Sequence, residues 1–186
     1  MLDKLFITNY SDRRCRPFKS ITRFSSKEVY VLAEELSQYS GNTFTSFSRF
    51  SENDFDGYYK KRLRTEEWLF NSFISVGGKP KNAHPLYFVL GESNYLNEWF
   101  EDGMKFQLAL NKIDPYDISF TFGDSMSIID RKDRMDLFNK DSLASFVQEK
   151  TNDVFIFLND LNQHNRYIEV QLWNDVYVED LIKESI

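Results

Sequence analysis

The chain has 186 residues, of which 41% are hydrophobic and 17% aromatic. This composition excludes a disordered or low-complexity protein, and the length is typical of one domain with a sizeable core. The single cysteine, Cys15, excludes an internal disulfide and a cysteine-based zinc site, and no apolar run reaches the roughly 20 residues of a membrane-spanning helix. We therefore expect one domain over residues 1–186, without a membrane span, in a reducing cytoplasm.

The formal net charge is −6, but the charge is distributed unevenly. Residues 1–64 contain 12 Lys or Arg and 8 Asp or Glu, whereas the remaining residues contain 11 and 21. Arg13, Arg14 and Arg16 share one predicted loop, and four of residues 60–64 are cations on a predicted helix. Such a distribution allows a basic face that contacts phosphates, and it is equally typical of a solvated surface.

The first half of the chain combines short strand patterns with two helical patterns. A capping-box sequence from Ser25 to Glu28 opens the first helix, and Gly77-Gly78 ends the second. In chain order, we expect a strand at residues 5–8, a strand or strand end at residues 21–24, a helix at residues 25–39, a strand at residues 43–48 and a helix at residues 54–76.

The second half contains four more strand patterns. We expect strands at residues 86–91, 106–110, 118–122 and 166–173, helices at residues 94–102, 142–150 and 153–163, a charged loop at residues 130–140, and a short helix or coil from residue 178. Together, these elements predict a single α+β domain. Its sheet is expected to be mixed but mostly antiparallel, with about six strands and with helices inserted early and late.

The last strand pattern has an unusual outward face. Alternation sends Ile168, Val170 and Leu172 to one side of the strand and Tyr167, Glu169, Gln171 and Trp173 to the other. An acid and an amide between two large aromatic residues indicate the wall of a cleft rather than an ordinary solvent-facing strand. Residues 118–122 alternate in the same way, with the hydroxyls of Ser119 and Thr121 on one face.

Common catalytic motifs are absent from the sequence. His84 and His164 are far apart and stand in no metal-binding spacing, so we expect no metal site. There is no G-x-S-x-G elbow and no glycine-rich phosphate loop. What remains is a carboxylate on a strand, hydroxyl-bearing strands, and arginines near strand ends. That set suits NAD-dependent glycosyl transfer, in which a carboxylate stabilises a developing oxocarbenium ion and cations hold phosphates.

A family resemblance points in the same direction. The sequence Thr22-Arg23-Phe24-Ser25-Ser26 precedes a helix; Gly77-Gly78, His84-Pro85-Leu86-Tyr87-Phe88 and Phe122-Gly123-Asp124 follow, and Ile168-Glu169-Val170-Gln171-Leu172 comes near the end. In this order the chain resembles the ADP-ribosyltransferase superfamily and is most similar to DarT-like toxins, which modify DNA bases with NAD. The resemblance implies Glu169 as the catalytic residue and Arg23 as a contact to the NAD ribose or nicotinamide.

The same resemblance implies further roles. Ser46, Ser119 and Tyr87 would help to hold NAD, and Arg62 and Arg64 would face a nucleic-acid target or the pyrophosphate. The protein would then be an ADP-ribosyltransferase-like member of a bacterial or phage conflict system, active on nucleic acid. The first motif carries Arg where relatives have His, and the last reads E-x-Q, so a register shift of two would put Gln171 in the catalytic position.

A second interpretation stays open. Each of these residues also has an ordinary structural explanation: an arginine pairs with an acid, a strand acid is half-exposed, and Tyr87 packs at the rim of the core. The protein would then be a non-catalytic interaction or inhibitor protein, whose acidic C-terminal two-thirds binds a basic protein partner.

Overall fold

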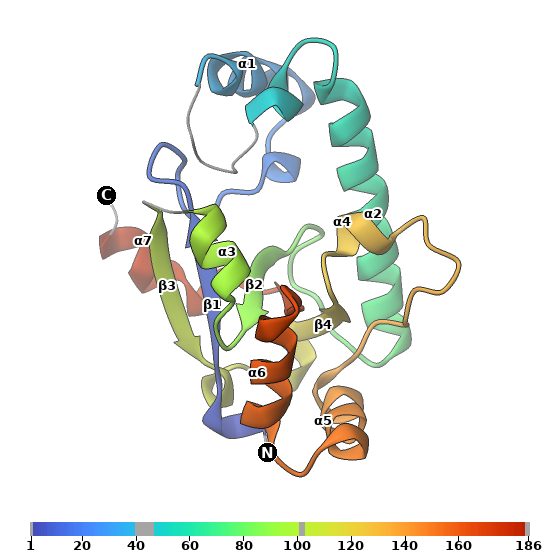
Figure 1. Ribbon diagram of the computed structural model, residues 1–186. Helices are drawn as coiled ribbons and strands as arrows, with labels where there is room; N and C mark the ends of the chain where they lie inside the picture. The colour runs from blue at the N-terminus through green and yellow to red at the C-terminus, as the bar shows by residue number, and fades with distance from the viewer. Residues whose placement is uncertain (1, 40–46, 101–102, 185–186) are drawn as a thin grey trace.

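The computed structural model describes residues 2–39, 47–100 and 103–184. Its centre is a five-stranded sheet in the order β3-β1-β2-β5-β4, with every neighbouring pair antiparallel (Figure 1). The strands are β1 (Phe6–Ser11), β2 (Leu86–Leu90), β3 (Met104–Ala109), β4 (Ile118–Phe122) and β5 (Ile168–Leu172). The predicted α+β class is confirmed. Within the described residues, however, the sheet has five strands rather than about six and is purely antiparallel.

The difference in strand number lies in the first half of the chain. Where the pattern predicts a strand or strand end, Ile21–Arg23 forms a 3₁₀ turn. The Ser20 and Thr22 hydroxyls are 2.8 Å apart, and the Arg23 amide donates to the Ser20 carbonyl; local bonds of this kind compete with a sheet ladder. The strand predicted at residues 43–48 falls mostly outside the described residues, as does Ser46, and Phe47–Phe50 is a second 3₁₀ turn.

The described residues form seven α-helices. They are α1 (Ser26–Ser37), α2 (Phe55–Ser75), α3 (Asn94–Trp99), α4 (Ser125–Ile128), α5 (Lys140–Lys150), α6 (Val154–Gln163) and α7 (Glu179–Glu184). The predicted capping box is present, because Ser25 and Glu28 each accept a hydrogen bond from the other's backbone amide. The helix α2 ends before Gly77, whose φ of 93° favours glycine. None of the described helices is long and apolar enough to cross a bilayer.

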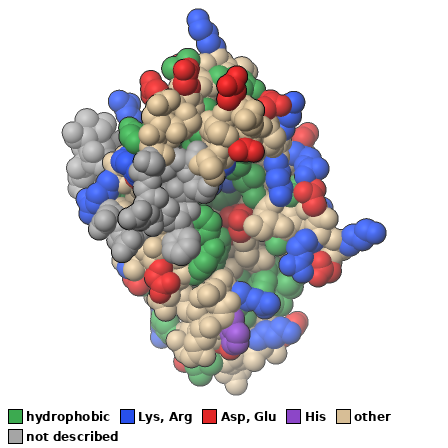
Figure 2. Space-filling view, turned by 45° about the horizontal axis from the view of Figure 1, so that its top comes forward, with side chains coloured by type: hydrophobic (Ala, Val, Ile, Leu, Met, Phe, Trp, Pro, Cys, Tyr) green, Lys and Arg blue, Asp and Glu red, His purple; other side chains and the backbone are tan. Residues whose placement is uncertain are grey.

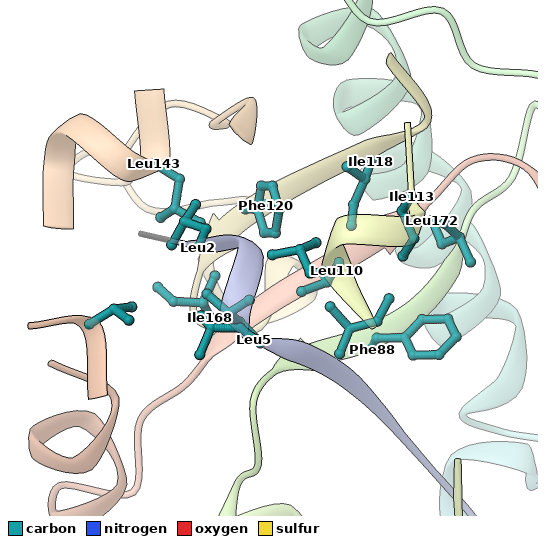
Figure 3. Packing of buried hydrophobic residues seen from close by; sticks show 14 of the residues in the cluster. Leu2, Leu5, Phe88, Leu110, Ile113, Ile118, Phe120, Leu143, Ile168 and Leu172 are labelled. Carbon is teal, nitrogen blue, oxygen red and sulfur yellow. The ribbon is translucent and has the colours of Figure 1, made fainter. Parts of the chain in front are cut away.

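One face of the sheet carries the main hydrophobic core. The inward residues of the three adjoining strands β2, β5 and β4 lie side by side: Phe88, Val170 and Phe120 form one row of the register. Leu143 from α5 and Leu161 from α6 belong to the same cluster. So do Leu2, in the 3₁₀ turn before β1, and Leu110, in the 3₁₀ turn after β3 (Figure 3). The predicted inward set of β5 is therefore buried as expected.

The opposite face is covered by α2. Leu69 and Phe73 of this long helix pack against Trp173, and the Phe73 and Trp173 rings stack with centroids 5.6 Å apart. The helix α1 and the first turn of α2 form a smaller cluster around Val29 and Phe55, beyond one end of the sheet (top of Figure 1). The face below α2 is consequently only partly filled by apolar side chains, and polar residues of the strands lie beneath the helix.

Candidate functional site

A row of side chains crosses the α2-covered face of all five strands. The register aligns Gln107, Thr8, Val89, Glu169 and Thr121 from β3 through β4. Side chains alternate along each strand, so members of one row that are directly paired point to the same face. Glu169 is the only acid in the row, and it lies between a valine and a threonine.

Glu169 is almost completely buried, with 7% of its surface exposed. Its Oε1 atom accepts hydrogen bonds from Gln171 Nε2 at 3.0 Å, from the Ser125 amide at 3.3 Å and from the Thr121 hydroxyl at 3.5 Å. Burial, with a smaller contribution from the charge of Asp124, outweighs these bonds and raises the pKa of Glu169 to about 7. The carboxyl group is therefore poised to change its protonation state near neutral pH.

A buried chain of hydrogen bonds fixes the neighbours of Glu169. Trp173 Nε1 donates to the Ser119 hydroxyl at 2.8 Å, and Ser119 donates to Gln171 Oε1 at 2.9 Å. Gln171 Nε2 then reaches Thr121 and Glu169 at 3.1 and 3.0 Å. Ser119 and Gln171 are fully buried, and their polar atoms are used within this chain. Their geometry orients Glu169.

Glu169 lies on the wall of a small cavity of about 180 Å³, here called the carboxylate cavity. Its other polar and aromatic lining residues are Thr8, Asn9, Tyr10, Tyr87, Phe88, Phe100 and Tyr167. Gln171 is not among its lining residues. Of the two acid-or-amide positions that the sequence left open, Glu169 is the one that borders this cavity.

A second cavity of about 300 Å³ adjoins the first and shares Asn9, Tyr10, Tyr87 and Phe100 with it. We call it the basic cavity, because four cations line it: Arg16, Lys19, Arg49 and Arg62. The one acid on its wall, Asp12, is paired with Arg14 at 2.7 Å. In Figure 2 a recess opens near the centre of the molecule, and many Lys and Arg side chains lie to its right.

Two buried polar atoms on these walls lack a hydrogen-bond partner among the described residues: Arg49 Nε, a donor, and Asn9 Oδ1, an acceptor. Buried polar atoms are nearly always paired in folded proteins, so such atoms indicate a ligand or ordered water. Arg49 lines the basic cavity, and Asn9 lines both cavities. The pair matches a ligand that offers an acceptor at one end and a donor at the other.

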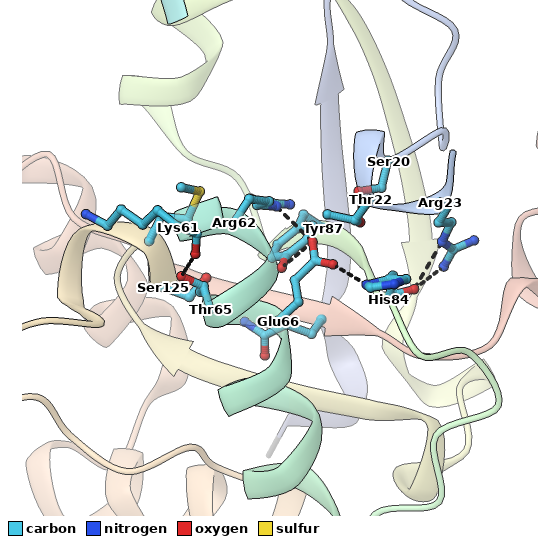
Figure 4. Close-up of polar contacts among 12 residues, drawn as sticks. Ser20, Thr22, Arg23, Lys61, Arg62, Thr65, Glu66, His84, Tyr87 and Ser125 are labelled. Carbon is cyan, nitrogen blue, oxygen red and sulfur yellow. Dashed lines mark hydrogen bonds and ion pairs between the residues drawn. The ribbon is translucent and has the colours of Figure 1, made fainter. Parts of the chain in front are cut away.

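Arg62, on the wall of the basic cavity, lies beside Tyr87 and Glu66 (Figure 4). Its guanidinium is 3.8 Å from the centroid of the Tyr87 ring, and its Nε donates to Glu66 Oε1 at 2.8 Å. The Tyr87 hydroxyl also donates to Glu66, at 3.1 Å. Tyr87 is thus a platform under Arg62. Arg64, two residues later, is exposed and pairs with Asp130 at 2.6 Å, so the two arginines do not share a surface.

Glu66 is completely buried and carries four side-chain contacts. Besides Arg62 and Tyr87, His84 Nδ1 lies 2.7 Å from its Oε2, and the Thr22 hydroxyl also forms a hydrogen bond with the carboxylate. Burial alone would raise the pKa of Glu66, but the hydrogen bond with His84 and the charge of Arg62 outweigh that effect, and its pKa is lowered. Glu66 is therefore the ionised partner in a buried cluster, in contrast to Glu169.

Arg23 is placed behind this cluster. It donates to the His84 carbonyl at 3.0 and 2.5 Å and pairs with Asp175 at 2.6 Å. It lines neither the carboxylate cavity nor the basic cavity. The structure places Tyr87 on the walls of both cavities and Arg62 and Arg49 on the wall of the basic cavity, but it does not bring Arg23 to the same walls.

A third cavity, of about 530 Å³, shares Tyr167 with the carboxylate cavity. We call it the arginine cavity: Arg131, Arg134 and Arg166 line it together with Tyr95, Trp99 and Phe122. Arg131 pairs with Asp133 at 2.8 Å, and Arg134 lies over the Trp68 ring at 4.7 Å. The carboxylate cavity, with Glu169 on its wall, thus shares lining residues with both the basic cavity and the arginine cavity.

Sequence reasoning did not identify Asn9, Arg49, Glu66 or His84 as site residues. The spacing of four between Arg62 and Glu66 on one helix was a usable signal for their pairing. The contact with His84 spans 18 residues and had no local signature. Asn9 and Arg49 became informative only through their buried, unpaired atoms.

Comparisons of the chain with protein-family models, with curated proteins and with solved structures gave no match. Within the described residues, no group of three His, Cys, Asp or Glu side chains is arranged to hold a metal ion.

Proposed function

We propose that the protein is an NAD-dependent ADP-ribosyltransferase-like enzyme with Glu169 as its catalytic residue. The observation that carries this proposal is the position of Glu169, a buried carboxyl group on the wall of a cavity that shares four lining residues with a cation-lined one. A carboxyl group with a raised pKa in a cavity is a candidate for catalysis, and a basic neighbour suits a phosphate-bearing substrate. NAD offers both a glycosidic bond whose cleavage a carboxylate can assist and phosphates that cations can bind.

The reaction would proceed by breaking the bond between nicotinamide and ribose C1′. The bonding electron pair leaves with nicotinamide, whose ring loses its positive charge, and positive charge develops on the ribose. An ionised Glu169 stabilises that charge, after which the acceptor forms a bond to C1′ and releases its proton. All described hydrogen bonds to Glu169 reach Oε1, which leaves Oε2 for the substrate.

Ionisation of Glu169 is coupled to binding of this substrate. The nicotinamide ring of NAD is cationic, and a cation beside a carboxyl group favours its charged form. With the pKa of Glu169 at about 7 in the free protein, we expect NAD to lower that pKa and to release protons when it binds near pH 6.

The basic cavity would take the pyrophosphate. Arg49 and Arg62 lie on its wall, and the unpaired Nε of Arg49 suits a phosphate oxygen. The unpaired Oδ1 of Asn9, on the wall shared with the carboxylate cavity, suits a ribose hydroxyl or the carboxamide N–H. The volumes of the two cavities are of the order expected for one extended ligand.

The acceptor would enter from the arginine cavity and meet C1′ near Tyr167. Its aromatic residues Tyr95 and Trp99 are suited to stack with a flat base, and its arginines suit phosphate groups. We therefore propose a nucleic acid as the acceptor. This activity is compatible with a toxin or defence role in a bacterial or phage conflict system.

The test uses the purified chain with NAD labelled in the adenosine moiety, together with single-stranded DNA, RNA and unrelated proteins. Label transfer by the wild-type chain and its loss in Glu169→Gln would support the proposal. Glu67→Gln, an exposed acid on α2, is the matched control and should transfer label normally. Transfer to proteins alone would keep the enzyme but reject the nucleic-acid acceptor.

The alternative function is that of a non-catalytic interaction or inhibitor protein bound to a basic protein partner. It predicts that a folded wild-type chain neither binds NAD in calorimetry nor transfers label. Proton uptake or release on mixing with NAD would speak against it.

A further inference from the structure

Glu66 is a buried, ionised carboxylate that the proposed reaction does not use. It lies on α2 and receives contacts from four segments: Arg62 on its own helix, Tyr87 on β2, His84 on the loop before β2, and Thr22 on the 3₁₀ turn Ile21–Arg23 (Figure 4). A buried carboxylate is costly unless it is paired and hydrogen-bonded. With four partners, Glu66 meets that condition.

Arg62 stands between two carboxyl groups. One is Glu66, to which its Nε is bonded, and the other is Glu169, whose pKa the charge of Arg62 lowers. The side chain of Arg62 is 16% exposed and lines the basic cavity. Without Glu66 as a partner on α2, we expect the Arg62 guanidinium to move toward Glu169, because an unpaired buried charge is costly and pairing with a carboxylate lowers that cost.

We propose that Glu66 is a positioning residue that holds the Arg62 guanidinium flat on Tyr87, facing the basic cavity and apart from Glu169. One edge of the guanidinium is taken by Glu66 and one face by the Tyr87 ring. The rest of the group is then available to an anionic ligand. The role in the reaction rests on the proposed function, whereas the effect on Arg62 and Glu169 does not.

Glu66 is itself braced from the side opposite Arg62. His84 contacts its Oε2, and the His84 backbone carbonyl accepts from Arg23, which pairs with Asp175. The carboxylate is therefore held at both oxygens, Oε1 by Arg62 and Tyr87 and Oε2 by His84. Such a brace fixes the distance between the guanidinium and Glu169, and it gives Arg23 a structural role at the back of the site.

The charged and titratable groups that face Glu169 come from several elements. They are Arg62 on α2, Tyr87 on β2, Asp124 before α4, and Tyr10 and Tyr167 on the wall of its cavity. Among them Arg62 and Tyr87 contact Glu66, and of these two only Arg62 is a cation. A change at Glu66 that acts through Arg62 should therefore be much smaller when Arg62 is absent.

The test measures the titration midpoint of Glu169 by carbon-detected NMR of its side-chain carboxyl group, in the absence of NAD. The signal is assigned by its loss in Glu169→Gln. In Glu66→Gln the freed Arg62 should move toward Glu169 and lower the midpoint by about one pH unit. In Arg62→Gln the cation is lost, and the midpoint should rise by a similar amount. Glu67→Gln should leave it unchanged.

Shifts of opposite sign in the two variants, together with at most a small further shift when Glu66→Gln is added to Arg62→Gln, support the positioning role. Shifts of the same sign, no shift in Glu66→Gln, or an undiminished downward shift when Glu66→Gln is added to Arg62→Gln would overturn it, since the loss of Glu66's own charge acts whether or not Arg62 is present. If Glu66→Gln does not fold, Glu66→Asp takes its place: its shorter carboxylate should lower the midpoint by less, and an unchanged or higher midpoint rejects the role.

Kinetics separate this inference from the proposed function. If NAD is a substrate, Glu66→Gln should raise KM for NAD about tenfold, because Arg62 no longer faces the phosphates. Opposite NMR shifts without any NAD turnover would reject the proposed function and keep the positioning role. NAD turnover with unshifted midpoints would keep the proposed function and reject the positioning role.

Discussion

Replacing Glu169 by Gln should make the protein more stable at alkaline pH but not at acid pH. The pKa of Glu169 rises from 4.5 in the unfolded chain to about 7 in the folded protein. The folded state thus prefers the protonated form, and stability is fully present below pH 4.5 and lost as the pH rises through 7. A shift of about 2.5 pKa units corresponds to about 3 kcal/mol. Gln cannot ionise and escapes this loss.

Urea unfolding of wild type and Glu169→Gln at several pH values between 5 and 9 measures the effect. The difference in unfolding free energy should grow in favour of the variant, by about 2.5 kcal/mol over this range, with most of the change below pH 7.5. Any constant cost of the new amide cancels from this pH dependence. Glu67→Gln, which alters an exposed acid, should follow the wild type. A difference that stays constant with pH would refute the assignment of a raised pKa to Glu169.

Three other substitutions test the surroundings of the site. Ser119→Ala removes the hydroxyl that joins a buried indole to a buried amide, and should lower the unfolding free energy by about 2 kcal/mol in urea titrations; unchanged stability would contradict the buried chain. Arg49→Gln should weaken NAD binding about tenfold in calorimetry while the melting temperature stays the same, and equal affinity would exclude Arg49 from the ligand site. Gly78→Ala should destabilise by about 1–3 kcal/mol, because a new Cβ would overlap the Phe73 ring, and full stability would show that the ring can move.

The alternation in residues 166–173 predicted the most useful feature of the fold. Successive side chains of a strand point to opposite faces, so Ile168 and Glu169 had to lie on different sides of the sheet. The main core buries Ile168, Val170 and Leu172, as the alternation predicts. The pairing of Thr121 with Glu169 could not be read from either strand, because register depends on contacts between segments 48 residues apart.

The local sequence could not show which of the arginines Arg23 and Arg62 faces a cavity. Arg23 stands at the position that the family resemblance favours, yet its guanidinium is used by the His84 carbonyl and by Asp175, 61 and 152 residues away. Arg62 appeared to belong to an exposed cationic run, but the crossing of α2 over the sheet turns it onto Tyr87. Only the tertiary arrangement decides which cation faces a cavity.

The strand predicted at residues 21–24 shows a different limit. Its β-branched and aromatic residues favour a strand, but the summed strand propensity of three or four residues is small. Local hydrogen bonds of hydroxyl side chains can outweigh it. Ser20 and Thr22 close a 3₁₀ turn there instead. Longer patterns, such as the capped helix α1 and the 21-residue helix α2, were predicted to within two residues at each end because many positions agree.

Release of nicotinamide measures the proposed role of Glu169 in the cleavage of NAD most directly. Wild type and Glu67→Gln, mixed with NAD and acceptor nucleic acid at pH 8, should release nicotinamide at equal rates. Glu169→Gln, which keeps the shape of the side chain but not its charge, should be slower by about 100-fold or more. Equal release by Glu169→Gln, or no release and no NAD binding by the folded wild type, would contradict the claim.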